Sequence, residues 1–114
     1  MTDHDALQPT EVRAPRGALV LEIDWADGHT SVHPHGWLRG YCPCASCQGH
    51  HGPIRYHEAG EPLLVDLSEV GNYALQLHWA DGHDTGIYSF DFLRRLCACA
   101  RCAPDGLEGR TFLR

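Results

Sequence analysis

The sequence predicts an α+β fold: a two-layer sandwich of a small antiparallel sheet with short helices, built as two similar halves with an internal pseudo-twofold repeat. Two observations predict it. Apolar residues alternate with polar ones along residues 19–25 and again along 73–79, which is the period of a strand with one buried face. The pentapeptide WADGH occurs at 25–29 and again at 79–83, and the spacing C-x-C-x-x-C follows each copy. The shared order of these motifs indicates a duplicated unit within one domain.

The chain begins with a segment that has no period. Residues 1–16 carry Pro9 and Pro15 among polar residues, so we expect a flexible N-terminal arm. The ordered domain is expected to span residues 17–102, and the C-terminal tail, residues 103–114, shows no strong pattern. A length of 114 residues favours a single core.

The first half is expected to form a hairpin followed by a helix. The strand at 19–25 turns at the first Asp-Gly pair and returns as a partner strand over 29–33. Pro34 suits the first turn of a short helix, which leads into the first cysteine motif.

The second half is expected to repeat this order after a loop. Residues 48–62 are rich in Gly, Pro and His and have no period, so they predict a surface loop. Strands are expected at 63–67 and 73–79, with a turn at the second Asp-Gly pair. Ser89 is the expected N-cap of a helix that ends before the second cysteine motif.

Composition narrows the function classes. The formal charge is −6, and all nine basic residues are arginines without a basic run, which argues against nucleic acid and anionic membranes as partners. Neither a signal peptide nor a stretch long enough to span a bilayer is recognisable, so we expect a cytoplasmic protein. Thiols stay reduced in that compartment, and six cysteines therefore indicate metal or redox chemistry before disulfides.

The two cysteine motifs carry this chemistry. Thiolates spaced C-x-C-x-x-C converge in a tight turn, which suits a metal ion with bonds of about 2.3 Å and suits disulfides between neighbours poorly. Three thiolates leave one tetrahedral position open, and histidine is a usual fourth ligand of zinc. His50 and His51 follow the first motif closely, whereas His29 and His83 each follow an Asp-Gly turn that presents a ligand rigidly. The histidines expected to be solvated are His33, His35, His57 and His78.

Three runs of the sequence resemble a known family. They are LEIDWADG at 21–28, LRGYCPCASC at 38–47 and VGNYALQLHWADGHDTGIYSFDFLRRLC at 70–97. Together they resemble the gamma-butyrobetaine hydroxylase-like N-terminal domain over roughly residues 17–98, here as a small stand-alone protein of bacterial type. The resemblance implies a two-layer α+β fold and a structural zinc ion. The ligands that it implies are Cys42, Cys44, Cys47 and His83.

The repeat suggests a second site. If a histidine of the second half completes the first cysteine motif, His29 of the first half can complete the second by the same geometry. That possible second site consists of Cys97, Cys99, Cys102 and His29. Here the chain departs from the family, which matches the first cysteine of this motif better than all three, so the alternative is a set of free thiols.

These observations favour a small metal-binding module over an enzyme. A non-haem iron oxygenase needs two histidines and a carboxylate, usually starting from His-x-Asp, and no His-x-Asp occurs in the 114 residues. We also expect the catalytic domain of the hydroxylases to be missing. The first hypothesis is a zinc module with a structural or protein-interaction role, with a protein partner or a homodimer possible.

Two alternatives remain open. Domains similar to this family are fused to scaffold ATPases of iron–sulfur cluster assembly, and thiolate-rich sites suit such clusters, so the second hypothesis is an accessory protein or carrier in that process. The third is a thiol oxidoreductase that uses the C-x-x-C part of each motif. It is the least favoured, because the second C-x-x-C lies at the C-terminal end of its predicted helix, where the helix dipole opposes a thiolate.

Overall fold

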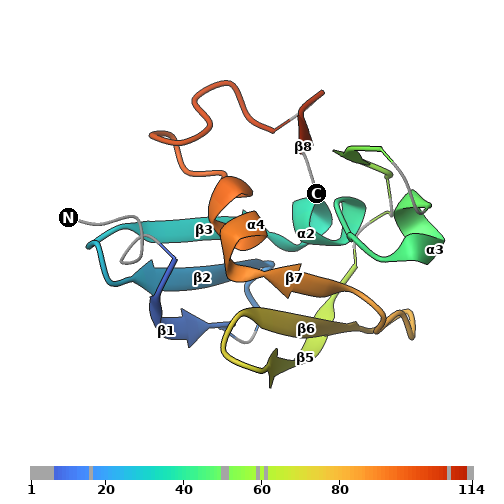
Figure 1. Ribbon diagram of the computed structural model, residues 1–114, viewed down its shortest axis with the longest axis horizontal. Coiled ribbons are helices and arrows are strands. Elements are labelled where there is room, and N and C mark those ends of the chain that lie inside the picture. The colour runs from blue at the N-terminus through green and yellow to red at the C-terminus, as the bar shows by residue number, and fades with distance from the viewer. Residues whose placement is uncertain are drawn as a thin grey trace.

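The computed structural model describes residues 7–15, 17–49, 52–58, 60, 62–107 and 109–112. They form an α+β fold of small antiparallel sheets and three short helices (Figure 1). The elements in chain order are β1 Pro9–Arg13, β2 Val20–Trp25, β3 Thr30–Pro34, α2 His35–Gly40, α3 Ala45–Gln48, β4 Ile54–Arg55, β5 Leu64–Val70, β6 Ala74–Trp79, β7 Ile87–Ser89, α4 Phe90–Arg95 and β8 Thr111–Phe112.

The strands form three separate sheets, where the sequence predicted one. Two sheets have three strands each, in the orders β1-β2-β3 and β5-β6-β7, and β4 pairs with β8 in a third. All pairings are antiparallel. In Figure 1 the three-stranded sheets occupy the lower half of the view, and α4, α2 and the β4-β8 pair lie above them. No helix in the described part of the chain is long and apolar enough to cross a membrane.

Both WADGH motifs form the predicted turn, and they form it in the same way. The carboxylates of Asp27 and Asp81 each accept a hydrogen bond from the backbone N–H two residues later, at 3.0 Å. Gly28 and Gly82 adopt φ angles of 92° and 87°, a left-handed conformation that glycine reaches at little cost. The two motifs therefore connect β2 to β3 and β6 to β7 with equivalent geometry.

The alternating strands supply the core, as predicted. Along β2 every second side chain is buried, and β6 buries its apolar face likewise. Each such side chain contributes about 1.5–3 kcal/mol through burial. The fully buried apolar side chains include Leu21, Ile23, Leu38, Tyr41, Leu75, Leu77, Tyr88, Leu93, Leu96 and Leu107.

The two longer helices begin where the sequence predicted. Pro34 precedes α2, and the Oγ of Ser89 accepts a hydrogen bond from the N–H of Phe92 at 3.1 Å, which caps α4. Tyr88 Oη donates to the carbonyl of Leu38 at 2.6 Å, so the start of α4 is tied to α2. Each helix thus delivers the chain to a cysteine motif from a fixed position.

The N-terminal segment differs from the prediction. Residues 9–13, assigned to a flexible arm, form β1 at the edge of the first sheet. Arg13 holds it there, with its guanidinium 2.6 Å from the carboxylate of Asp24 and 3.3 Å from that of Glu22. An edge strand fixed by backbone pairing and ion pairs needs no apolar alternation, and the sequence pattern therefore did not reveal it.

The predicted surface loop and C-terminal tail also contain structure. Ile54–Arg55 pairs with Thr111–Phe112, and Leu107 and Phe112 are buried. The single O–H of Tyr41 lies between two carbonyl acceptors and is shared by Leu107 at 2.8 Å and Arg110 at 2.7 Å. Strands of two residues are too short to show a period, so the pattern missed them.

Candidate metal centres

The first cysteine motif and His83 meet in one cluster. The Nε2 atom of His83 lies 3.2 Å from the Sγ of Cys42, 3.5 Å from that of Cys44 and 3.6 Å from that of Cys47. All four ligand atoms lie within 4.8 Å of one another. The structure thus brings together the residues implied by the family resemblance, from positions 36 to 41 residues apart along the chain.

These distances fit a single tetrahedral ion. Zn–S bonds of about 2.3 Å and a Zn–N bond of about 2.0–2.1 Å, at tetrahedral angles, place nitrogen and sulfur roughly 3.6 Å apart. The observed separations of 3.2–3.6 Å are close to this value. The four atoms therefore surround a point that can hold one metal ion without rearrangement of the backbone.

Local structure fixes the three cysteines. Cys42 follows α2, and Cys44 is the N-cap of α3, whose last turn contains Cys47. The side chain of Gln48 joins this segment to β4, because its amide donates to the carbonyls of Cys42 at 3.1 Å and Arg55 at 2.8 Å and accepts from the N–H of Arg55 at 2.9 Å. Sequence reasoning missed Gln48, since a glutamine after a cysteine carries no distinctive pattern.

The turn at Asp81 aims His83 at the sulfur atoms. Asp81 accepts the His83 N–H at 3.0 Å and also an Arg39 Nε–H at 3.3 Å. The same guanidinium lies 3.7 Å from the Sγ of Cys47. Arg39 thereby connects the turn that carries the histidine with the motif that carries the thiols, and its charge favours the thiolate form.

The second cysteine motif meets His29 in a matching cluster. The Nε2 atom of His29 lies 3.5 Å from the Sγ of Cys97, 3.8 Å from that of Cys99 and 3.3 Å from that of Cys102. These atoms also lie within 4.8 Å of one another, so this group too can hold a metal ion. Arg94 makes two hydrogen bonds to the carboxylate of Asp27, at 2.9 and 3.1 Å, as Arg39 contacts Asp81 at the first cluster.

Comparison with known proteins identifies the family. Residues 12–94 match the family described as gamma-butyrobetaine hydroxylase-like, N-terminal. The chain belongs to this family. The family resemblance inferred from the sequence motifs is thereby confirmed.

Relatives in the family include larger enzymes. The gamma-butyrobetaine dioxygenase of Pongo abelii is 31% identical over 85 residues, and that of Homo sapiens is 28% identical over 90 residues. Each match covers 71% of this chain but only 21% of the dioxygenase. The chain thus spans about a fifth of the length of these relatives, and their activity does not pass to it with the match.

Two similar proteins have solved structures. The crystal structure of a protein of unknown function in the DUF971 family, from Acidithiobacillus ferrooxidans ATCC 23270, is 41% identical with a TM-score of 0.68. That match covers 81% of this chain and 94% of the other. An NMR solution structure of a second protein is 32% identical, also with a TM-score of 0.68, and the match covers 85% of this chain and 74% of the other.

The middle thiol of each motif has a lowered pKa. Burial raises the pKa of Cys42 to about 12. Burial also opposes ionisation of Cys44, but hydrogen bonds from Thr85 and from Cys47 outweigh it and lower the pKa to about 6. In the second motif, burial is outweighed at Cys99 by hydrogen bonds from the Cys102 backbone and neighbouring thiols, and the pKa falls to about 7. A bound cation favours the thiolate form at all three positions of a motif.

His29 is suited to the neutral form that binds metals. Burial, followed by the nearby charge of Arg94, lowers the pKa of His29 below its ordinary value. All six cysteines are free thiols, in line with the expectation of metal or redox chemistry over disulfides. Each cluster therefore combines one imidazole with three thiols, a donor set that zinc favours.

The remaining histidines divide into three groups. His33 and His35 were expected to be solvated, which is wrong: both are buried. His33 Nδ1–H donates to the Leu96 carbonyl at 3.2 Å, and Nε2 is hydrogen-bonded to the Ser31 hydroxyl at 2.8 Å, so both ring nitrogens have partners despite the burial. His57 is exposed and His78 half-buried. His50 and His51, the alternative ligands close to the first motif, lie outside the described residues.

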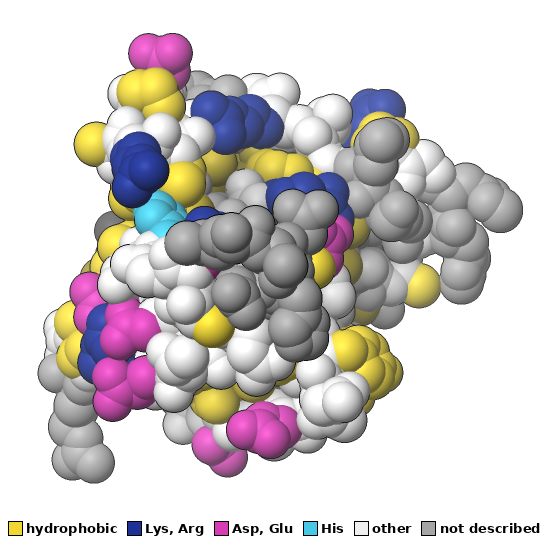
Figure 2. All heavy atoms as spheres, turned by 60° about the vertical axis from the view of Figure 1, so that its left-hand side comes forward, with side chains coloured by type: hydrophobic (Ala, Val, Ile, Leu, Met, Phe, Trp, Pro, Cys, Tyr) yellow, Lys and Arg dark blue, Asp and Glu magenta, His cyan; other side chains and the backbone are white. Residues whose placement is uncertain are grey.

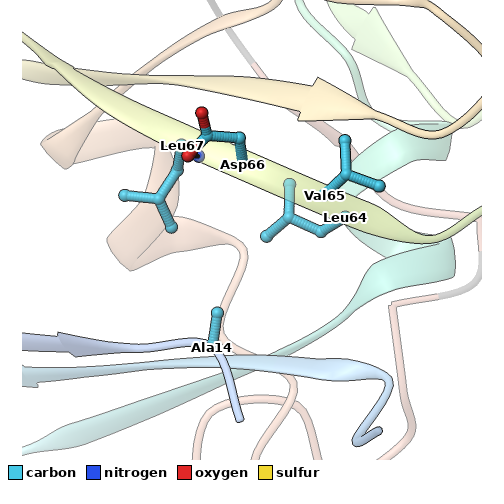
Figure 3. A pocket seen from close by; sticks show the side chains of 5 residues that line it. All are labelled: Ala14, Leu64, Val65, Asp66 and Leu67. Carbon is cyan, nitrogen blue, oxygen red and sulfur yellow. Dashed lines mark hydrogen bonds between the residues drawn. The ribbon is translucent and has the colours of Figure 1, made fainter. Parts of the chain in front are cut away.

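A hollow of about 340 Å³ lies away from both clusters, between β5 and Ala14 (Figure 3). Leu64 and Leu67 point from β5 toward the side of Ala14, whereas Val65 points away from it. Val65 falls at an irregularity in the register with β6, which accounts for its 58% exposure. The polar side chain in this lining is Asp66, so the hollow lacks the converging polar groups of a ligand site.

Proposed function

We propose that the protein is a zinc-binding module with a structural or protein-interaction role. The observation that carries the proposal is the position of His83 Nε2, 3.2–3.6 Å from all three sulfur atoms of the first motif. Three thiolates and one imidazole complete a tetrahedron around zinc and leave no position for a substrate or water. A closed coordination sphere is typical of structural rather than catalytic zinc.

The ion would join distant parts of the fold. Its thiolates come from the segment after α2, and its imidazole comes from the turn between β6 and β7. Because the site is complete only when these parts are packed together, the free energy of metal binding adds to the stability of the fold. This is the structural role that we propose.

We also propose that the fold is a two-layer sandwich of two similar halves related by a pseudo-twofold axis. Its support is the reciprocity of the contacts. His83 of the second half faces the thiols of the first, and His29 of the first half faces the thiols of the second. Arg39 and Arg94 likewise each contact the turn aspartate of the opposite half.

Accessory or carrier function in iron–sulfur cluster assembly is the alternative, and six free thiols in two motifs favour it. The compactness of each cluster favours a single ion instead. A cluster of several irons spreads its ligands over different iron atoms, whereas here one nitrogen lies within 3.8 Å of three sulfurs in both groups. Under the zinc proposal, the six reduced thiols fit a location in the cytoplasm. The proposed partner is another protein or a second copy of the chain.

Metal analysis of the natively purified protein tests the proposal. We expect at least one zinc ion per chain, a colourless protein, and a fall in melting temperature on chelation. Cys42→Ser should abolish binding at the first cluster, whereas Ser46→Ala, an exposed position inside the same motif, should not. Protein with no bound metal and all thiols free would refute the proposal, and a brown iron-containing protein would favour the alternative.

A further inference from the structure

The two clusters share a ligand set but differ in how firmly they hold it. In the first, Cys47 is half-buried, lies in the last turn of α3 and receives the Arg39 contact at 3.7 Å. In the second, Cys102 is exposed and lies in a turn after α4. Cys102 of the second cluster is therefore more accessible to solvent than Cys47 of the first.

The residue after each motif adds to this difference. Gln48 follows the first motif and makes three hydrogen bonds that join the motif to β4. Fifty-five residues later in the sequence, Ala103 follows the second motif. Alanine has no polar side-chain atom, so it cannot make the corresponding bonds.

A hollow opens onto the second cluster. It measures about 300 Å³ and is lined by Asp27, Gly28, His29, Arg94, Arg101 and Cys102. Two of these residues are ligands of the cluster, and two are arginines. Figure 2 turns this side of the molecule toward the viewer, and arginine side chains gather mainly in the upper half of that face. Arg94 is paired with Asp27 in the same lining, so Arg101 carries the remaining positive charge beside the cluster, and this charge attracts an anionic group into the hollow.

We propose that Cys97, Cys99, Cys102 and His29 form a second metal site that exchanges its ion with anionic chelating groups, while the first site retains its ion. This inference rests on the proposal that the clusters bind metal. In the exchange step a donor atom of the incoming group bonds to the ion as the bond to Cys102 Sγ breaks. Further donor atoms of the same group then replace Cys97, Cys99 and His29, and the three released thiolates take protons from solvent. No electron is transferred, and the incoming group leaves with the ion.

Cadmium NMR on the full chain separates the two sites. With both sites loaded we expect two cadmium resonances, of which Cys44→Ser removes one and Cys99→Ser the other. After addition of EDTA, the resonance assigned through Cys99→Ser should decay about tenfold faster or more, because the Arg39 contact and the Gln48 side-chain hydrogen bonds restrain the first motif, whereas Cys102 is exposed.

Charge dependence tests the role of the hollow. Arg101→Gln should slow removal of this ion by anionic EDTA about two- to fivefold, and leave removal by uncharged phenanthroline unchanged. Arg110→Gln removes the same charge outside the residues that line the hollow and should change neither rate.

The outcomes separate this inference from the proposed function. Equal decay rates, faster loss from the first site, or binding of a single ion that Cys44→Ser abolishes would overturn the exchange proposal and leave the structural zinc intact. An unchanged EDTA rate in Arg101→Gln would remove the arginine-lined hollow as the route of exchange. A chain that binds no cadmium at all would instead refute the proposed function.

Discussion

Gly86 offers a perturbation aimed at one of the two sites. A Cβ atom placed on it would lie 2.7 Å from the Sγ of Cys42 and 2.9 Å from the ring of Tyr88. Tyr88 cannot retreat freely, because its hydroxyl is hydrogen-bonded to the Leu38 carbonyl at 2.6 Å. The backbone conformation of Gly86 itself places no restriction on alanine, since its φ is not positive. The effect of Gly86→Ala is therefore purely steric.

The geometry sets the size of the effect. Ordinary contact needs a separation of about 3.5 Å, so the sulfur would have to move by about 0.8 Å. Metal–ligand distances tolerate roughly 0.2 Å, and we expect affinity at the first cluster to fall by at least about tenfold. The added methyl group should also lower the free energy of unfolding by about 1–3 kcal/mol through overpacking.

Competition with a chromophoric chelator, in a Cys99→Ser background that leaves only the first cluster, measures this affinity. The matched control is Gly36→Ala in α2, where a Cβ would have no heavy atom within 4 Å. It should leave metal affinity unchanged and stabilise the helix slightly. Unchanged affinity in Gly86→Ala would refute the position that we assign to the Cys42 sulfur.

Three further results are expected. Asp27→Asn should lower the melting temperature in thermal unfolding by about 4 °C more than Asp81→Asn does. The reason is that Asp27 is better shielded from solvent than Asp81 and accepts two hydrogen bonds from Arg94. Equal losses in the two variants would contradict this. Tyr41→Phe should cost about 1–2 kcal/mol in chemical unfolding and speed hydrogen exchange at Arg110, Thr111 and Phe112, since the Leu107 and Arg110 carbonyls lose the hydroxyl that they share. Burial lowers the pKa of His33 from 6.5 to about 4, so the folded state favours the neutral imidazole. The resulting stability is fully present above pH 6.5, and up to about 3 kcal/mol of it is lost as the pH falls toward 4. The variant His33→Gln should lack this pH dependence.

Much of the fold was predictable because the alternating strand pattern, the WADGH motif and the cysteine spacing each occur twice in the sequence. The alternation along β2 and β6 reflects a buried face, and each WADGH motif combines a carboxylate that accepts a backbone N–H with a glycine in the left-handed conformation. These features act locally, so they are readable from neighbouring residues. The pairing of each motif with the distant histidine followed from the repeat and the family resemblance together.

The rest depended on contacts that leave no local pattern. β1 is an edge strand held by ion pairs of Arg13, and its polar residues resemble a flexible arm in sequence. β4 and β8 are two residues long, and their paired residues lie 56 and 58 positions apart in the sequence. The burial of His33 likewise depends on a hydroxyl and a carbonyl from separate segments. Only the assembled tertiary structure reveals such partners.

Each half supplies a histidine to the cysteine motif of the other half, and this arrangement explains how one ion can be labile without loss of the fold. Each WADGH turn closes its own hairpin, presents its histidine to the other half and receives an arginine from that half. Under the proposed function, a metal ion at either cluster stabilises the same packing of these two parts of the chain. When the second ion leaves through the hollow beside Cys102, the first ion and both arginine–aspartate pairs still hold the halves together. A retained ion at the first site is thus the physical condition for exchange at the second.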